Sequence, residues 1–181
     1  VCEGTNVTFT ATPTNGGTAP IYQWTLNGSN VGTNSTTYSN SNLVNGDVVA
    51  VSMTANNACQ TANLATSNST TALINTVVTP SVSIVSSLGS GIGCLGANIV
   101  FTATPLNGGA AATYQWKFNG VNVGTNSTNY TTANVAIGDQ ITCDMTASNA
   151  CQSANVVTSN TIAPQFAPTT LTTTSASNCG P

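Results

Sequence analysis

The sequence predicts an all-β chain made of two tandem copies of one β-sandwich. Three observations lead to this prediction: the chain repeats itself at a fixed offset, apolar and polar residues alternate inside the repeated segments, and the composition favours strands and turns. Thr and Val suit strands, Asn and Gly suit turns, and the usual charged helix formers are nearly absent because only 3% of the 181 residues are charged. A hydrophobic fraction of 40% still supplies a core, so we expect the chain to fold rather than stay disordered.

The repeat has a constant offset of 92 residues. From Cys2 to Asn68, 40 of 67 positions are identical to those from Cys94 to Asn160 without a gap. A unit of this length is a domain rather than a solenoid repeat. We therefore expect one domain over residues 1–79 and a second over 80–168, with a boundary near Thr79–Pro80, where proline interrupts the connector.

The two repeats differ at their starts. The segment "SVSIV" at 81–85 alternates and could open the second domain as a first strand, whereas the first domain begins at Val1-Cys2 without a counterpart. Residues 169–181 are expected to be a tail, a linker, the start of a further repeat or a donor strand. Two explanations stay open: the chain is cut from a longer array, or the tail of one subunit fills the missing first strand of the next.

Period-2 alternation predicts strands in "NVTFTAT" (6–12), "IYQWTL" (21–26) and "DVVAVSMT" (47–54), and in their copies 92 residues later. Four aromatic residues on the apolar faces are the predicted core: Phe9, Trp24, Phe101 and Trp116. The pair Asn27-Gly28 predicts a type I′ hairpin, because both residues tolerate positive φ. Short strands separated by such turns are typical of a sandwich.

The string "GTNVTFTATPTNGG…YQWTLNG…LVNGDVVAVSM" resembles an immunoglobulin-like domain. The resemblance implies two tandem immunoglobulin-like β-sandwiches. It also places the inter-sheet cysteines of that family at Ala11 with Val51 and at Ala103 with Cys143, so the central disulfide of antibody domains is absent.

The chain is more closely similar to the immunoglobulin-like or PKD-like repeats of large Bacteroidota cell-surface proteins of the adhesin and gliding type. The similarity covers both repeats, from the first cysteine through "YQW" and "NGD" to the cysteine near the end. It implies secretion to the cell surface. It carries little about function, because a fold does not determine one.

Six cysteines are present. Cys2 and Cys59 are the two cysteines of the first repeat, so we predict that they pair, and the repeat then pairs Cys94 with Cys151. Disulfides of this kind indicate an oxidising, extracellular setting. Cys143 replaces Val51 of the first repeat and is expected to be a buried thiol rather than a reactive one. Cys179 is expected to belong to a further repeat or to link chains.

The charge balance excludes several classes of partner. Lys117 is the single basic residue and the formal net charge is −3, which argues against nucleic acid and anionic membranes. Membrane insertion is not expected, because no apolar run approaches a span. The cysteine spacings lack a C-x₂-C pair and the chain lacks histidine, so no metal or cofactor site is predicted. Lys117 is expected to be a solvated surface residue rather than part of an isopeptide bond.

No catalytic residues are predicted, because acid–base work at neutral pH usually needs His, Lys, Cys or paired carboxylates. Asp47 and Asp139 are expected to stabilise turns rather than to bind calcium, and Asp144 to face solvent. We expect a non-catalytic extracellular structural repeat: a spacer or stalk of a surface adhesin, or a subunit of a filament assembled by strand complementation. Its partners would be copies of itself or further repeats.

The alternative function is a carbohydrate-binding module that recognises surface glycans. Tyr22, Trp24, Tyr114 and Trp116 are the aromatic residues that could form its platform. Their alternation with Gln23 and Gln115 favours the interior instead.

Overall fold

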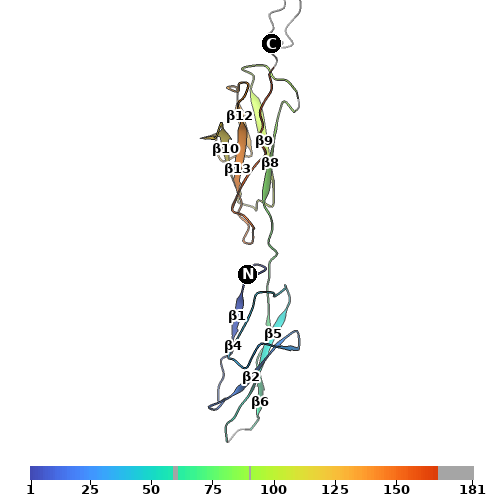
Figure 1. The fold of residues 1–181 in the computed structure, drawn as a ribbon, viewed down its shortest axis with the longest axis vertical. Coiled ribbons are helices and arrows are strands. Elements are labelled where there is room, and N and C mark those ends of the chain that lie inside the picture. Colours follow the sequence, from blue (N-terminus) through green and yellow to red (C-terminus); the bar gives the residue numbers. More distant parts are fainter. Residues whose placement is uncertain (59–60, 90, 167–181) are drawn as a thin grey trace, which may run out of the picture. The chain divides into compact units, whose positions relative to one another are not determined.

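The computed structural model describes residues 1–58, 61–89 and 91–166. Within this part the chain is all-β and contains no helix, with sheets packed against each other as in a β-sandwich (Figure 1). The predicted all-β, sandwich-like fold is therefore confirmed. The chain divides into two compact units, Val1–Val77 and the part from Val78 onward, close to the sequence boundary at Thr79–Pro80.

Unit 1 contains two antiparallel sheets. The smaller sheet pairs β1 (Val7–Thr10) with β4 (Thr37–Asn40). The larger sheet has the order β3 (Ser29–Val31), β2 (Ile21–Leu26), β5 (Val48–Thr54) and β6 (Leu64–Thr66), with the short β7 (Thr70–Thr71) also paired to β5.

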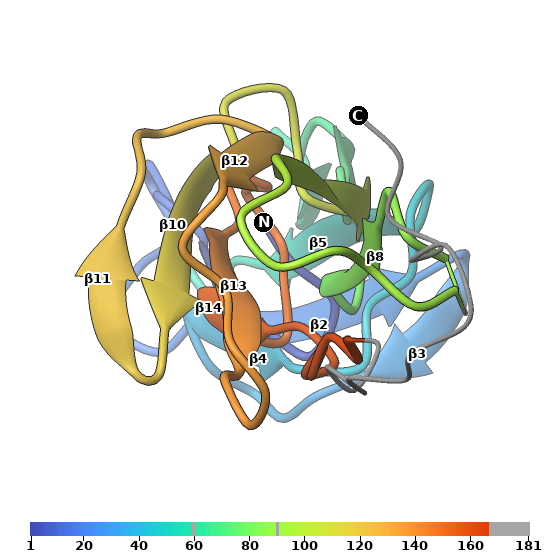
Figure 2. The ribbon, with the colours of Figure 1, turned by 90° about the horizontal axis from the view of Figure 1, so that it is seen from above.

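Unit 2 repeats most of this plan, with one strand added and an isolated bridge, Ile141 with Ile162, at the place of β7. Its larger sheet has the order β11 (Val121–Val123), β10 (Thr113–Phe118), β13 (Ile141–Thr146) and β14 (Val156–Thr158); Figure 2 shows β11 beside β10 at the edge. The other sheet has three strands: β12 (Asn129–Thr132), β9 (Ile99–Leu106) and β8 (Ser81–Ser86). The strand β8 has no counterpart among the described residues of unit 1.

The Asn-Gly hairpins form as the sequence predicts. Asn27 and Gly28 both have positive φ, 50° and 80°, and the loop between paired Leu26 and Ser29 holds only these two residues. This is the geometry of a type I′ turn, whose twist matches the flanking strands. Asn119 and Gly120 adopt the same angles in unit 2.

The two indoles lie in the two cores. Trp24 is 3% exposed and Trp116 is fully buried. Each indole N–H donates to a backbone carbonyl, at 2.8 Å for Ser35 and 2.9 Å for Ser127, so the polar group of each buried ring is satisfied. Phe101 is also fully buried, whereas its repeat partner Phe9 is only half-buried.

Candidate functional site: a groove in unit 1

The strand β8 closes one side of unit 2. It pairs with β9 along its whole length, from Ser81 opposite Leu106 to Ser86 opposite Phe101. Its alternate side chains Val82 and Ile84 are 7% and 3% exposed and belong to the core. Burial of aliphatic side chains of this size stabilises a fold by roughly 1.5–3 kcal/mol each, so β8 contributes substantially to unit 2.

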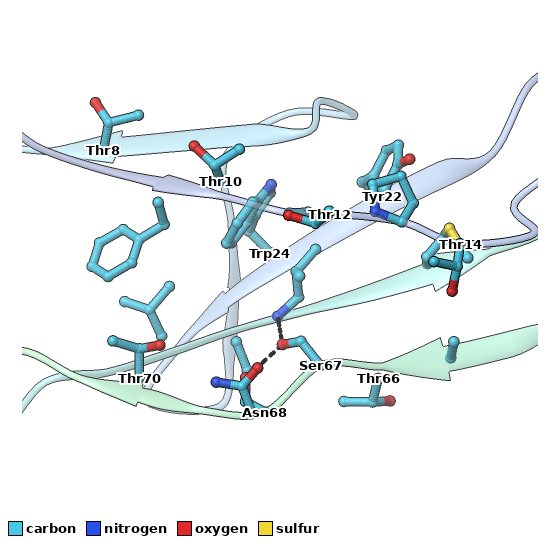
Figure 3. Close-up of a pocket in the computed structure, with 18 residues that line it drawn as sticks. Thr8, Thr10, Thr12, Thr14, Tyr22, Trp24, Thr66, Ser67, Asn68 and Thr70 are labelled. Carbon is cyan, nitrogen blue, oxygen red and sulfur yellow. Dashed lines mark hydrogen bonds between the residues drawn. The ribbon is translucent and has the colours of Figure 1, made fainter.

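Unit 1 has a groove at the equivalent place. The groove has a volume of about 570 Å³ and lies between β1 on one side and the β6–β7 segment on the other, with β2 and β5 beneath (Figure 3). Figure 3 shows Thr8, Thr10 and Thr12 along one rim and Thr66, Ser67 and Asn68 along the other. No ionisable side chain of the described residues, apart from the phenol of Tyr22, lines it.

The floor of the groove is apolar. Phe9, Ala11 and Val51 line it, and they are the repeat counterparts of Phe101, Ala103 and Cys143. In unit 2 those three residues are at most 4% exposed, while Phe9 and Ala11 are half-buried. The groove is therefore the incompletely covered core that β8 covers in unit 2.

The backbone of β1 is also shortened and unpaired on one edge. In unit 2, β9 continues to Leu106 because β8 pairs with it, whereas β1 ends at Thr10 and pairs only with β4 among the described strands. A free strand edge presents unpaired N–H and C=O groups that can bind another strand. The groove thus combines an apolar floor with a hydrogen-bonding edge.

An asparagine on the opposite rim marks where the strand would be held. In unit 2 the Asn160 side chain accepts a hydrogen bond from Ile84 N at 2.8 Å and donates one to Ile84 O at 3.1 Å. The counterpart Asn68 lines the groove, and its side-chain amide bonds to none of the described residues. Asn68 was not among the predicted site residues, although the repeated "TSN" at 66–68 and 158–160 is visible in the sequence.

The aspartates of the two turns are occupied by structural contacts. Asp47 accepts from Asn27 Nδ2 at 2.8 Å and from Val44 N at 2.9 Å, and Asp139 accepts from Asn119 Nδ2 at 2.8 Å and from Ala136 N at 2.7 Å. These side-chain and backbone hydrogen bonds lower the pKa of both carboxyls. Within the described residues, no cluster of three or more His, Cys, Asp or Glu could hold a metal ion.

The single lysine forms an ion pair. Lys117 Nζ lies 2.7 Å from Asp144 Oδ2, and Thr158 Oγ1 donates to Asp144 Oδ1 at 2.6 Å. Burial raises the pKa of Asp144, but the hydrogen bonds from Lys117 and Thr158 and the lysine charge outweigh it, so the net shift is downward. Asp144 was expected to face solvent; its side chain is 18% exposed and pairs with Lys117 diagonally across β10 and β13.

Cys143 is the free cysteine of the described residues, and it is fully buried. Desolvation, with the charge of Asp144 as a second cause, raises the pKa of its thiol to about 11. The thiolate needed for nucleophilic attack is therefore scarce at neutral pH. These properties agree with a small apolar core residue.

No protein-family model and no curated protein matches this chain. No described helix is long and apolar enough to cross a membrane.

The cysteines are disulfide-bonded at Cys2, Cys94 and Cys151, while Cys59 and Cys179 lie outside the described residues. The predicted Cys94–Cys151 pair is wrong. Cys151 lies beside Val78, whose N–H donates to the Cys151 carbonyl, ahead of β8. Gly93 lies beside Leu88 and Phe166, beyond the other end of β8.

The length of β8 separates the two cysteines. Six strand residues span about 20 Å, and bonded cysteines need Cα atoms roughly 4.4–6.8 Å apart. The predicted Cys2–Cys59 pair rests on the same repeat, so it loses that support as well. The spacing along the sequence could not reveal that the two positions lie at opposite ends of a sandwich.

The four aromatic residues named for a sugar-binding platform pack in or against the two cores. Trp24 and Trp116 lie in the cores, Tyr22 is 7% exposed, and Tyr114 is packed against the unit 2 core. Tyr38 and Tyr130 stack on the two indoles at centroid distances of 5.9 Å. Within the described residues, both tryptophans are thus used in packing.

Proposed function

We propose that the chain is a non-catalytic structural repeat of an extracellular assembly, and that the groove of unit 1 receives a β-strand from a neighbouring copy. The resemblance to surface-protein repeats and the disulfide-bonded cysteines support the extracellular setting. The observation that carries the strand proposal is β8, which fills the equivalent position of unit 2 with Val82, Ile84 and a backbone ladder to β9.

The incoming strand would have the same alternation of buried aliphatic and exposed residues as β8. Two aliphatic residues at alternate positions would cover Phe9 and Ala11, and its backbone would pair with β1 and with the amide of Asn68. Such β-augmentation draws affinity from main-chain hydrogen bonds and specificity from alternate side-chain pockets. The tail at 169–181, which lies outside the described residues, is one donor that the sequence suggests.

A synthetic peptide of residues 79–88, "TPSVSIVSSL", tests the groove directly. We expect it to bind the full chain and to raise the thermal midpoint of unit 1, because it supplies the two buried aliphatic side chains. The matched control carries Val82→Asn and Ile84→Asn and should not bind. Absence of binding by the first peptide at millimolar concentration would reject the strand-accepting groove.

Assembly is tested separately. Mass photometry and sizing of the full chain should show concentration-dependent oligomers, and deletion of 167–181 should abolish them if the tail is the donor. A chain that binds the peptide but stays monomeric would keep the groove and reject donation by a neighbouring copy.

A further inference from the structure

The groove of unit 1 continues into a second hollow beyond the end of β1. This hollow has a volume of about 380 Å³ and shares Thr14, Met53 and Ala65 with the groove; Figure 3 shows Thr14 at this end. In unit 2 the counterpart of Met53, Met145, is fully buried, whereas Met53 is only half-buried. The open site of unit 1 is therefore longer than β8 alone.

In unit 2 the two residues ahead of β8 prolong the strand at this end. Pro80 is buried, as are Val82 and Ile84 at the next alternate positions, so the three side chains point to the same side. Asn107 Nδ2 donates to the Thr79 carbonyl at 3.0 Å. The segment that completes unit 2 therefore begins with a proline and has the pattern Pro-x-Val-x-Ile.

A proline in the acceptor strand fixes the register of pairing. Asn160 binds both backbone groups of Ile84, so these groups point away from β9. Pairs with and without hydrogen bonds alternate along an antiparallel ladder, so the pair Val82–Pro105 also lies at a position without them, where the missing N–H of proline costs nothing. Pro13 occupies the same place in unit 1. A slip of one residue would bring Pro13 to a hydrogen-bonding position and turn the apolar side chains outward.

The side-chain amide of Asn15 is placed to hold the entering end of a strand. Asn15 lines the second hollow and is the counterpart of Asn107. Its φ of 56° matches the 51° of Asn107, and each backbone carbonyl accepts a hydrogen bond from an asparagine side chain, Asn57 or Asn149. The two turns are thus held in the same way, but the Asn15 amide bonds to none of the described residues.

We therefore infer that the groove is selective for an extended segment of the type Pro-x-Val-x-Ile, bound antiparallel to β1 with its proline beside Asn15. This inference rests on the proposed function, because it names the class of strand that the groove accepts. Asn15 would donate to the carbonyl before the proline, as Asn107 does in unit 2. Asn68 would bind both backbone groups of the isoleucine, as Asn160 does for Ile84.

The pattern also decides between donors. Residues 80–84 carry it, whereas in the tail Pro168 is followed at the two aliphatic positions by Thr170 and Thr172. Their hydroxyl groups would lose contact with water against the apolar floor of the groove, which is unfavourable without new hydrogen bonds. The occupant is therefore the leading strand of a repeat in a neighbouring copy rather than the tail.

Peptides separate this inference from the proposed function. The reference, residues 79–88, is titrated into the full chain beside its reversed sequence, its Pro80→Ala form and the tail segment 167–176, "APTTLTTTSA". The reversed and tail peptides should bind at least about tenfold more weakly, and Pro80→Ala at least about twofold. No binding by any peptide would reject the groove and this inference together. Equal binding of the reference and the reversed peptide would reject this inference alone.

Variants of the chain provide the second test. Asn15→Asp keeps the size of the side chain and tolerates the positive φ, but it replaces the donor with an acceptor, so the reference peptide should bind about two- to tenfold more weakly. Asn107→Asp adds the same charge to unit 2 and should leave the affinity unchanged. An unchanged affinity in Asn15→Asp would overturn the inference, although the groove would still bind the peptide.

Photolabelling determines the direction of the bound strand. A photoreactive group at the amino end of the reference peptide should label the segment around Asn15. The same group at the carboxyl end should label the segment around Val7, because Ser86 pairs with Phe101, the counterpart of Phe9. Labels in the opposite order would contradict the inferred direction and would leave the strand-accepting groove in place.

Discussion

The side-chain amide of Asn160 makes two hydrogen bonds with the backbone of Ile84. Its Oδ1 accepts from the Ile84 N–H at 2.8 Å, and its Nδ2 donates to the Ile84 carbonyl at 3.1 Å. Ile84 is the central residue of the apolar face of β8, so one polar side chain fixes the strand that completes the core of unit 2. The same asparagine recurs as Asn68 in unit 1, where β8 has no counterpart among the described residues.

Removal of this amide should affect the two units unequally. Asn160→Ala loses both hydrogen bonds and leaves the two backbone groups of Ile84 without these partners, so we expect unit 2 to lose about 1–3 kcal/mol. Asn68→Ala is the matched control and should be nearly neutral in the isolated chain. Hydrogen exchange of peptides from each unit measures both. An equal loss in both units would contradict the assigned role.

Core phenylalanines give a second matched pair. Phe101→Ala should destabilise unit 2 by about 3–5 kcal/mol, because the ring is fully buried and leaves a cavity. Phe9→Ala should cost unit 1 clearly less, since Phe9 faces the groove and is half-buried. Urea unfolding of both variants provides the comparison. If the β8 peptide is bound, the cost of Phe9→Ala should rise towards that of Phe101→Ala.

Patterns among residues close together in the sequence predicted much of the fold. The alternation in "YQW" placed Trp24 and Trp116 inward, and Asn27-Gly28 defined a two-residue turn, because both depend on residues close in sequence. The gapless repeat also showed that the counterpart of the strand at 81–85 falls outside the printed sequence. The absence of this strand is the one feature of the groove that the sequence predicted.

Long-range relationships could not be read in the same way. The repeat equated Cys2 with Cys94 and Cys59 with Cys151, but only the strand directions show that Cys94 and Cys151 lie at opposite ends of β8. The Lys117–Asp144 pair was missed because it depends on the register between β10 and β13. Asn160 was missed because its partner, Ile84, is 76 residues away.

Below about pH 8, stability should depend on pH only at the acid end. The pKa values of Asp47, Asp139 and Asp144 are lowered in the folded chain from an ordinary value of 3.8. A lowered folded pKa contributes stability above the unfolded value, and this is lost as pH falls through the folded one. The chain has no histidine, so the thermal midpoint should be flat between about pH 5 and pH 8 and fall below about pH 4.

A double variant identifies the groups responsible for the fall in thermal midpoint at acidic pH. Asn27→Ala with Asn119→Ala removes the largest cause of the shift at Asp47 and Asp139, so the fall in midpoint below about pH 4 should become shallower. An unchanged fall in midpoint at acidic pH would show that these hydrogen bonds do not set the pH dependence of stability.

Cys143 should be inert in the native chain. Its burial and a pKa of about 11 predict no alkylation by iodoacetamide at pH 8, followed by complete alkylation in urea, as measured by intact mass. Cys143→Val copies Val51 of the first repeat and should change unit 2 stability by less than about 1.5 kcal/mol. Rapid alkylation of the folded chain at this residue would contradict its placement in the core.

The Lys117–Asp144 ion pair should contribute little despite its 2.7 Å separation. The two side chains retain 32% and 18% exposure, so solvent screens the attraction, and pairs at the surface typically contribute about 0.2–1 kcal/mol. Lys117→Thr and Asp144→Ser restore the residues of the first repeat, Thr25 and Ser52, and a double-mutant cycle by urea unfolding isolates the coupling. It should fall within that range and shrink in 1 M NaCl, where screening is stronger. A coupling above ~2 kcal/mol that resists salt would mean that the pair is desolvated, in conflict with its exposure, and would give the single lysine a structural role that the first repeat lacks.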